Sequence, residues 1–257
     1  IEGFYQRLRM FTGWPLLAGY FLLPWLQWGD RPAVLFDLPE RKFHILFMTF
    51  WPQDFPLLAW LLIISAFALF TVTVFLGRVW CGYTCPQTVW TDLFILVERW
   101  IEGDRNARVR LWNQKWDARK ARLRVTKWTV WMLIALATGG AWVFYFTDAP
   151  TLAVDLFTFS AHPIAYTTIG VLTATTFVFG GFMREQVCIY MCPWPRIQAA
   201  MMDEDTITIA YRDWRGEPRG KHRKAEGAEL LGDCIDCNAC VNVCPMGIDI
   251  RDGQQLA

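Results

Sequence analysis

The six-residue pattern Cys-x-x-x-Cys-Pro occurs twice in this chain, as CGYTCP at residues 81–86 and as CIYMCP at residues 188–193. Each copy follows a long apolar run. A third block, CIDCNACVNVCP, extends from Cys234 to Pro245, and the three blocks together contain all eight cysteines of the chain. The apolar runs therefore decide where the cysteines lie.

The overall composition is typical of a membrane protein. Of the 257 residues, 54% are hydrophobic, 16% are aromatic and fifteen are Trp, a balance that is unusual for a water-soluble domain of this length. The formal net charge is only +1, so the chain as a whole shows no charge excess for binding nucleic acid. We expect no nucleic-acid partner.

Four stretches have the roughly 20 apolar residues that a helix needs to cross a bilayer. We predict from them an all-α polytopic membrane protein rather than a large soluble core of buried helices. A shorter apolar stretch, Phe43–Gln53, has about half of the required length. We expect it to lie at the membrane interface or to fold back against the helices. The four predicted spans are Phe11–Trp28, Pro56–Leu76, Trp128–Phe146 and Ile164–Met183.

The distribution of basic residues predicts the orientation of these spans. The segment Gly77–Lys127 carries eleven Lys or Arg residues, whereas the loop Thr147–Pro163 carries none. By the positive-inside rule the basic segment is cytoplasmic and the loop without Lys or Arg is outside. Both ends of this chain and all its cysteines are then cytoplasmic, where disulfides are not expected. The basic segment is also expected to contact anionic lipid of the membrane.

The two Cys-x-x-x-Cys-Pro motifs follow the second and the fourth predicted span, and both of these spans run from outside to inside. The chain thus reads as two parallel half-repeats of two transmembrane helices each. Such halves usually pair about an axis along the membrane normal. That axis would bring Cys81 and Cys85 close to Cys188 and Cys192.

The spacing within each motif suits a metal site. Residues four apart on a helix are neighbours, so each motif can offer two sulfurs to one ion. Pro86 and Pro193 suit the first position of a new helix, which would place Cys85 and Cys192 at its N-terminal end. The helix dipole there favours the thiolate, the form that binds metal. We expect an amphipathic helix on the inner surface after Pro86, with an apolar face of Val89, Leu93, Leu96, Val97, Trp100 and Ile101.

Thiolate ligands select Cu(I), Zn or iron–sulfur clusters, so the four cysteines of these motifs are candidate ligands and redox residues. The alternative is that they are small buried hydrophobic side chains, as free cysteines often are. Their duplicate spacing at equal membrane depth favours the metal site. Four thiolates around one monovalent ion would leave negative charge that is costly to bury. The candidate compensating charges are Arg78, Arg184 and Arg196, and the candidate thioether ligands are Met183 and Met191.

The third cysteine block is the most specific motif of the chain. Cys234, Cys237, Cys240 and Cys244, followed by Pro245, have the spacing of the bacterial ferredoxin run that binds a [4Fe–4S] cluster. In two-cluster ferredoxins the fourth cysteine ligates the other cluster. Cys244 then ligates either a cluster shared with the two Cys-x-x-x-Cys-Pro motifs or a cluster whose other ligands lie in a motif beyond residue 257. A structural zinc site is the alternative, but zinc-binding pairs are usually further apart.

These features predict two parts of the chain. Residues 1–202 form the membrane domain, and residues 203–257 form a cytoplasmic linker followed by the ferredoxin-type segment. The histidines give no sign of haem, because His44 and His162 are expected outside and His222 falls in the polar linker. We expect His44 to be a half-buried interfacial side chain rather than a copper contact with Met48.

A resemblance to a known family rests on four stretches: GRVWCGYTCPQTVW at 77–90, RKFHILFMTFWPQDF at 41–55, VCIYMCPWPRIQ at 187–198 and CIDCNACVNVCPMGIDIRDG at 234–253. They are similar to the CcoG/FixG (RdxA) family, accessory proteins for assembly of cbb3-type cytochrome c oxidase. The resemblance implies a membrane-bound polyferredoxin that reduces Cu(II) to Cu(I) for copper delivery to the oxidase. It also implies a second ferredoxin motif, a fifth span and an outer immunoglobulin-like domain, which are not in this sequence.

Two functional hypotheses follow. In the first, a metalloreductase, a cytoplasmic donor feeds the cluster of Cys234–Cys244, and copper is reduced at Cys81, Cys85, Cys188 and Cys192. In the second, a quinone-linked electron conduit without a copper role, those four thiols hold an additional iron–sulfur cluster. A scaffold for oxidase assembly is a third hypothesis, which the complete ferredoxin motif disfavours.

The expected location is the inner membrane of a bacterium. The expected partners are membrane lipid, copper, the cytoplasmic electron donor, and copper chaperones or cbb3-type oxidase assembly factors. A second copy of the chain, giving a homo-oligomer, is a further candidate partner.

Overall fold

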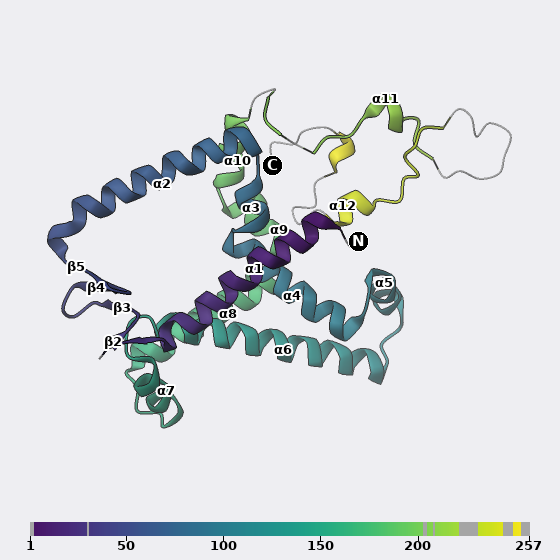
Figure 1. Cartoon of the computed structure of the whole chain (residues 1–257). Helices are drawn as coiled ribbons and strands as arrows, with labels where there is room; N and C mark the ends of the chain where they lie inside the picture. Colours follow the sequence, from purple (N-terminus) through teal and green to yellow (C-terminus); the bar gives the residue numbers. More distant parts are fainter. Residues whose placement is uncertain are drawn as a thin grey trace. The chain divides into compact units, whose positions relative to one another are not determined.

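The computed structural model describes residues 3–29, 31–202, 205–207, 209–220, 231–243 and 249–252. The chain is mostly helical (Figure 1). It divides into two compact units. The larger unit comprises residues 3–67 and 81–183, and the smaller unit comprises residues 68–80 and the described residues from 184 onward.

Most of the long helices belong to the larger unit. Short helices separate some of them: η1 (Leu23–Trp25), η2 (Pro52–Asp54) and α3 (Val79–Tyr83). The longer helices are α1 (Phe4–Leu22), α2 (Phe55–Leu76), α4 (Pro86–Glu102), α5 (Arg105–Asn113), α6 (Ala118–Val143), α7 (Ala149–Phe157) and α8 (Pro163–Gly181). The final turns of α2 and the start of α3 fall in the smaller unit.

Two of the described helical segments, Pro52–Leu76 and Pro163–Gly181, are long and apolar enough to cross a membrane. These two segments contain most of the second and fourth predicted spans. In Pro52–Leu76, only 6% of the most apolar stretch of 18 residues is buried within the protein. A helix that exposes such a surface requires an apolar environment. The other two predicted spans coincide with α1 and α6 for most of their length, and the four-span arrangement in half-repeats stays a prediction.

Five short strands between Gln27 and Phe50 correct the expectation that the chain is all-α. Strand β1 (Gln27–Trp28) pairs with β2 (Arg31–Pro32), and β3 (Val34–Asp37), β4 (Lys42–Ile45) and β5 (Met48–Phe50) form an antiparallel meander. The apolar stretch Phe43–Gln53 thus forms two strands and the start of η2. It is too short for a spanning helix, and pairing satisfies its backbone groups instead. The backbone N–H of Phe36 donates to the carbonyl of Tyr145 (2.8 Å), which ties the meander to the segment after α6.

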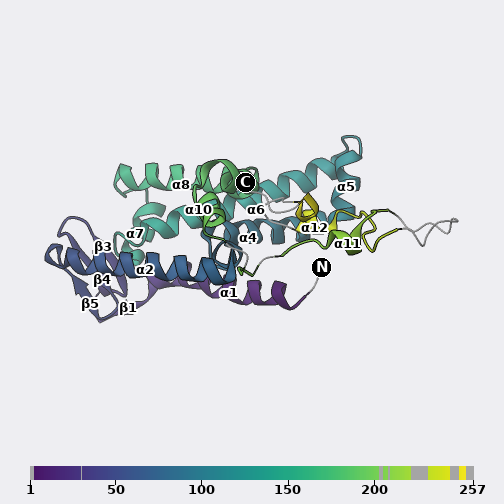
Figure 2. The same cartoon turned by 90° about the horizontal axis from the view of Figure 1, so that it is seen from above.

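Helices α6 and α8 pack along each other, and α4 packs against both (Figures 1 and 2). At the centre of this packing lie Phe94 of α4, which is fully buried, and Trp131 of α6, which is 2% exposed. The indole N–H of Trp131 donates to the carbonyl of Phe94 (3.2 Å). On α8, a Cβ atom at Gly180 would lie 3.2 Å from the Phe94 ring, and one at Gly181 would lie 3.1 Å from the Trp131 ring. Glycine at these positions therefore allows the close approach of the three helices.

A buried network of ion pairs joins α4 to α5 and α6 toward the C-terminal end of α4. Lys127 of α6 contacts Glu98 (3.2 Å) and Glu102 (2.8 Å), and all three side chains are largely buried. Arg108 contacts Glu98 (2.9 Å) and Arg124 approaches Glu102 (3.6 Å). Removing one partner of a buried pair leaves an uncompensated charge, which costs about 3–5 kcal/mol. The network therefore fixes α4 and α5 against the first turns of α6.

The smaller unit consists of short elements around the end of α2. They are α9 (Arg184–Gln186), the π-helix η3 (Val187–Met191), α10 (Trp194–Met201), α11 (Asp213–Gly216), α12 (Ala239–Val243) and η5 (Ile250–Asp252). Thr206 donates from its hydroxyl to the carbonyl of Val74 (2.8 Å), and the N–H of Ile207 donates to the carbonyl of Phe75 (3.3 Å). These bonds use carbonyls near the C-terminal end of α2, where helices need outside donors.

The contact between α6 and α8 predicts opposite effects for two adjacent glycines. A Cβ at Gly139 would meet the carbonyl oxygen of Ile169 at 3.0 Å and the hydroxyl of Thr173 at 3.0 Å, whereas a Cβ at Gly140 would meet nothing within 4 Å. We expect Gly139→Ala to lower stability by about 1–3 kcal/mol, because the backbone of α8 must move. Gly140→Ala should leave stability unchanged or raise it by about 0.5–1 kcal/mol, since alanine favours a helix over glycine. Thermal unfolding of the purified protein, followed by tryptophan fluorescence, measures both; equal midpoints for the two variants would contradict this packing.

Candidate metal sites

The first cysteine motif lies where α3 ends and α4 begins. Cys81 is inside α3, and Cys85 is the N-cap of α4 with Pro86 as the first helical residue. This confirms the prediction that Cys85 stands at the N-terminal end of a new helix. The helix does not continue through both cysteines, however, because a residue before proline avoids the helical conformation. Cys85 accordingly has φ −59° and ψ 127°, and α3 ends at Tyr83.

Contacts from three directions hold this motif in the larger unit. The Thr88 hydroxyl donates to the carbonyl of Cys81 (2.6 Å), and the Gln87 side chain donates to the carbonyl of Phe179 near the end of α8 (3.1 Å). Arg9 of α1 pairs with Asp92 of α4 (2.5 Å). Cys81 and Cys85 themselves are half-buried, so both residues keep some contact with the surroundings of the protein.

Helix α4 is amphipathic, but its buried face is shifted from the predicted one. Val89, Phe94 and Val97 are buried, whereas Leu96 is exposed and Trp100 is 82% exposed. The sequence pattern predicted the helix correctly, and it predicted part of the buried face, namely Val89 and Val97. Phe94, the most buried of these residues, lies outside the predicted set because packing against α6 and α8 decides the rotation of the helix.

The second motif has a different local structure. Cys188 lies in the π-helix η3, and Cys192 follows that helix and precedes Pro193, the N-cap of α10. The N–H of Cys192 donates to the carbonyl of Val187 (2.8 Å), a bond of the π-helical type. Pro193 was expected at the first position of the helix and is its N-cap instead, so Cys192 stands one position further from the helix. Like Cys85, Cys192 precedes a proline and is extended, with φ −85° and ψ 120°.

The two motifs belong to different units of the structure. Cys81 and Cys85 are in the larger unit, and Cys188 and Cys192 are in the smaller one. Their convergence on one site stays a prediction. The arginines expected to compensate thiolate charge, namely Arg78, Arg184 and Arg196, are all in the smaller unit, and the first two are half-buried. Of the candidate thioether ligands, Met183 is half-buried and Met191 is exposed.

The structure describes three of the four cysteines of the ferredoxin-type block. Cys234 is half-buried, Cys237 and Cys240 are exposed, and Cys244 lies outside the described residues. Asp236 and Asn238, which stand between these cysteines, have φ values of 50° and 54°. Asn and Asp tolerate this left-handed conformation better than other residues with side chains. The chain can therefore turn tightly between closely spaced thiols, as the predicted ferredoxin-type cluster site requires.

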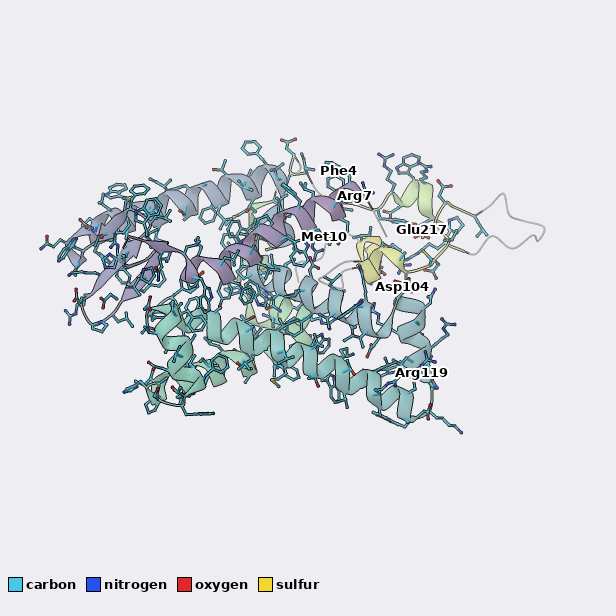
Figure 3. The ribbon with its side chains drawn as sticks, turned by 60° about the horizontal axis from the view of Figure 1, so that its bottom comes forward. Phe4, Arg7, Met10, Asp104, Arg119 and Glu217 are labelled. Atoms are coloured by element: carbon cyan, nitrogen blue, oxygen red, sulfur yellow. The ribbon has the colours of Figure 1, made fainter. Side chains whose placement is uncertain are left out.

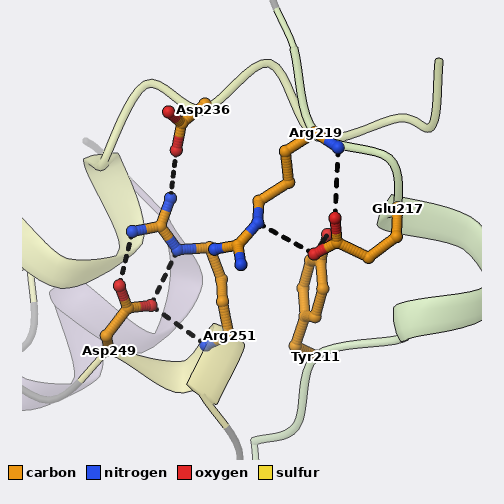
Figure 4. A network of polar contacts seen from close by, with 6 residues as sticks. All are labelled: Tyr211, Glu217, Arg219, Asp236, Asp249 and Arg251. Atoms are coloured by element: carbon orange, nitrogen blue, oxygen red, sulfur yellow. Dashed lines mark hydrogen bonds and ion pairs between the residues drawn. The ribbon is translucent and has the colours of Figure 1, made fainter.

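An ion-pair network around Arg251 supports the same loop (Figure 4). The side chain of Arg251 is 8% exposed and donates to Asp236 (2.5 Å) and to Asp249 (2.7 Å). The hydrogen bonds from Arg251 lower the pKa of Asp249 to about 2, and Asp249 in turn raises the pKa of Arg251. Beside it, Arg219 pairs with Glu217 (2.8 Å). Arg251 thus links the loop between two cysteines to the segment that follows the block.

Within the described residues, no three Cys, His, Asp or Glu side chains come together to hold a metal ion. The donor set still fits a [4Fe–4S] cluster, because that cluster is held by cysteine thiolates and the described thiols of the block are accessible. The seven described cysteines form no disulfide.

The two described histidines have other contacts. His44 hydrogen-bonds through Nδ1 with Arg31 and with the hydroxyl of Thr49 (3.0 Å). Burial and the charge of Arg31 lower its pKa. His162 caps α8 by accepting from the N–H of Ile164 (3.3 Å). Both side chains serve the local structure, and His222 lies outside the described residues.

Comparison with known proteins assigns iron–sulfur domains to both cysteine regions. A 4Fe-4S dicluster domain matches residues 183–257, and a 4Fe-4S binding domain matches residues 58–104. The first match contains Cys188, Cys192 and the ferredoxin-type block, and the second contains Cys81 and Cys85. The chain is an iron–sulfur protein.

Three relatives cover nearly all of this chain. Protein RdxB of Cereibacter sphaeroides is 63% identical over 100% of the chain, and nitrogen fixation protein FixG of Rhizobium meliloti is 58% identical over 99%. Protein RdxA of Cereibacter sphaeroides is 64% identical over 94% of the chain. The chain belongs to the FixG/RdxA/RdxB family, which confirms the resemblance found in the sequence. It spans only 50–55% of the length of these relatives. No solved structure matches the chain.

Sequence reasoning missed two residues of these sites, Thr88 and Arg251. Thr88 falls within the quoted stretch GRVWCGYTCPQTVW, and Arg251 within CIDCNACVNVCPMGIDIRDG. A lone hydroxyl and a lone arginine carry no periodic signal, so only their contacts identify them.

The position of Arg251 predicts an effect on the iron–sulfur segment. We expect Arg251→Gln to lower the iron and sulfide content of purified protein, because Asp236 loses its buried partner. The reduction potential of the remaining cluster should become more negative, since removing a nearby positive charge disfavours an added electron. The matched control is Arg215→Gln. Arg215 pairs with Asp233, which directly precedes Cys234, but the side chains of Arg215 and Asp233 are 62% and 65% exposed. Exposed pairs contribute only about 0–1 kcal/mol, so equal losses in both variants would contradict a special role of Arg251.

Proposed function

We propose that this chain is the membrane-bound electron-transfer part of a protein that reduces Cu(II) to Cu(I) for assembly of a cbb3-type cytochrome c oxidase. One observation carries the proposal. A single chain combines a ferredoxin-type block with two Cys-x-x-x-Cys-Pro motifs, in each of which proline holds the second cysteine extended just ahead of a helix.

The proposed topology has four spans, formed by α1, α2, α6 and α8, in two half-repeats. The apolar helices α2 and α8 support it, as does the contrast between the basic segment Gly77–Lys127 and the loop Thr147–Pro163. The basic segment includes α5 and the start of α6. Asp104, the N-cap of α5, and Arg119, in the first turn of α6, are labelled in Figure 3. All cysteines then face the cytoplasm, where they would meet an electron donor and cytoplasmic copper.

The ferredoxin-type block would hold the electron-carrying cofactor. Cys234, Cys237, Cys240 and Cys244 are the ligand set for a [4Fe–4S] cluster, which supplies one electron at a time when bound. The dicluster domain matched over residues 183–257 supports a second cluster in the whole protein. Arg251 and Asp236 hold the loop between the first two of these cysteines.

The paired motifs would bind copper as the substrate. Cu(II) prefers nitrogen and oxygen ligands, whereas soft thiolates select Cu(I), so a pocket of thiolates favours the reduced ion. Each turnover moves one electron from a cytoplasmic one-electron donor to one Cu(II), which leaves as Cu(I). Cys81 and Cys85 alone give only two sulfurs, so the proposal requires Cys188 and Cys192 as well.

A second candidate function rests on a specific observation. The 4Fe-4S binding domain matched over residues 58–104 includes Cys81 and Cys85. In this alternative the paired motifs hold an additional iron–sulfur cluster, and the protein is a quinone-linked electron conduit without a copper role.

Substitution of one cysteine in each motif separates these functions. We expect Cys85→Ser and Cys192→Ser each to abolish most Cu(II) reduction, because a hydroxyl is a poor ligand for Cu(I). The double variant should be no worse than either single one. The assay supplies Cu(II) to dithionite-reduced, desalted protein and follows Cu(I) with a specific chelator. The absorption and EPR signals of the Cys234–Cys244 cluster serve as the control and should be unchanged.

Two results would contradict the copper reductase. One is reduction of Cu(II) at the parent rate by both single variants. The other is a loss of iron and sulfide from both variants in equal proportion, which would assign the paired motifs to a cluster and favour the electron conduit.

The topology has its own test, which uses two exposed positions in the structure. Thr151 lies in α7 and Gln114 follows α5, and both side chains are exposed. In intact cells a membrane-impermeant thiol reagent should label Thr151→Cys above the background of the parent protein. Gln114→Cys should be labelled only after permeabilisation. The reverse pattern would place the native cysteines outside and remove the basis of the proposed cytoplasmic electron donor.

A further inference from the structure

The chain between Cys81 and Cys85 leaves main-chain groups without regular helical partners. Helix α3 has only five residues, and helices generally leave their last carbonyls without intrahelical donors. Pro86 lacks an N–H, so it cannot bond to the carbonyl of Gly82 as a helical residue would. Without further contacts, the first cysteine of the motif would be connected to the second only through this interrupted turn.

Thr88 makes a contact that bridges the interruption. It is the third residue of α4, its side chain lies in the buried part of the helix, and its hydroxyl donates to the carbonyl of Cys81 at 2.6 Å. Cys85 is the N-cap of the same helix. The main chain at both cysteines is therefore fixed to the first turn of α4, one through the covalent chain and the other through the Thr88 hydroxyl.

We propose that Thr88 is a positioning residue that sets the separation and direction of the Cys81 and Cys85 side chains, and so the affinity of this half-site for its metal. The proposal rests on the proposed function, in which these two cysteines are metal ligands. The Thr88 hydroxyl, 2.6 Å from the carbonyl oxygen of Cys81, restrains the peptide plane next to the Cα atom that carries the Cys81 side chain. Groups that orient metal ligands commonly change metal affinity by about 10–100-fold when removed.

The second motif differs at the position equivalent to Thr88. The residue seven positions after Cys188 is Pro195, which has no hydroxyl. There the N–H of Cys192 bonds to the carbonyl of Val187 within the π-helix. The two half-sites, Cys81 with Cys85 and Cys188 with Cys192, thus have different hydrogen bonds around a cysteine that is extended before proline. A change at Thr88 removes a bond in the first half-site.

The same helix supplies a matched control. Thr91 lies one turn after Thr88, its side chain is also buried, and its hydroxyl has no hydrogen-bond partner among the described residues. Valine has nearly the shape of threonine without the hydroxyl. Thr88→Val and Thr91→Val therefore make the same chemical change at two neighbouring buried positions, and only the first removes a bond to the cysteine motif.

The test measures metal binding by the full chain, purified in detergent. Cys85→Ser first identifies the metal of this half-site, either as lost Cu(I) binding in competition with bicinchoninate or as lost iron and sulfide. On that same readout we expect Thr88→Val to weaken Cu(I) binding about tenfold or more, or to lower iron retention and broaden the cluster's EPR signal. Thr88→Ser, which keeps the hydroxyl, and Thr91→Val should both stay at the parent value. Thr88→Ala replaces Thr88→Val if the valine variant does not fold.

The outcomes distinguish this proposal from the proposed function. If Cys85→Ser binds metal like the parent, Cys85 is not a ligand and the proposed function fails. If Cys85→Ser loses metal while Thr88→Val binds at the parent value, the half-site stands and Thr88 does not position it. Equal losses in Thr88→Val and Thr91→Val, or a loss in Thr88→Ser, would also overturn the positioning role, because the effect would then not follow the hydroxyl.

Discussion

The close packing of α4, α6 and α8 around Phe94 is the contact on which the larger unit depends. Phe94 is fully buried, its carbonyl accepts from Trp131, and its ring rests against Gly180 of α8. Gly180 and Gly181 have no side chain to separate α8 from the Phe94 and Trp131 rings, so the three helices make close van der Waals contact there. Since Cys85 is the N-cap of α4, the packing that buries Phe94 also positions the start of α4 and the cysteine motif before it.

Charge completes this arrangement where apolar packing ends. The ion pairs of Lys127 with Glu98 and Glu102 hold the C-terminal half of α4, and the pair of Arg9 with Asp92 holds α1 against its middle. Arg251 has a comparable role in the smaller unit, because it ties the loop of Asp236 to Asp249. In both units a charged side chain with little exposure joins segments that are far apart or irregular, and such a charge is tolerated only with partners.

Proline and cysteine together give the two halves of the chain their common feature. Pro86 and Pro193 both hold the preceding cysteine extended, with ψ values of 127° and 120°. The surroundings of the two motifs differ. In the first motif Cys85 is the N-cap of α4 and the Thr88 hydroxyl donates to the carbonyl of Cys81, whereas in the second Cys192 follows a π-helix. The proposed copper chemistry requires a pair of thiolates from each half, and the two half-sites need not be equivalent. A half-site held by side-chain bonds and one held by a π-turn can respond differently when copper changes its valence and its preferred geometry.

The sequence by itself determined the parts of this protein that local rules govern. The cysteine spacing and the quoted stretches identified the iron–sulfur family, and Pro86 marked the start of α4, because both signals are complete within a few residues. The apolar runs located α2 and α8 for the same reason. Only the tertiary structure decided that Phe43–Gln53 forms strands, since a short apolar stretch has no periodicity that separates strand from helix. It alone showed the helix break between Cys81 and Cys85, the burial of Phe94, and the bonds of Thr88 and Arg251, because these follow from which segments come together in space.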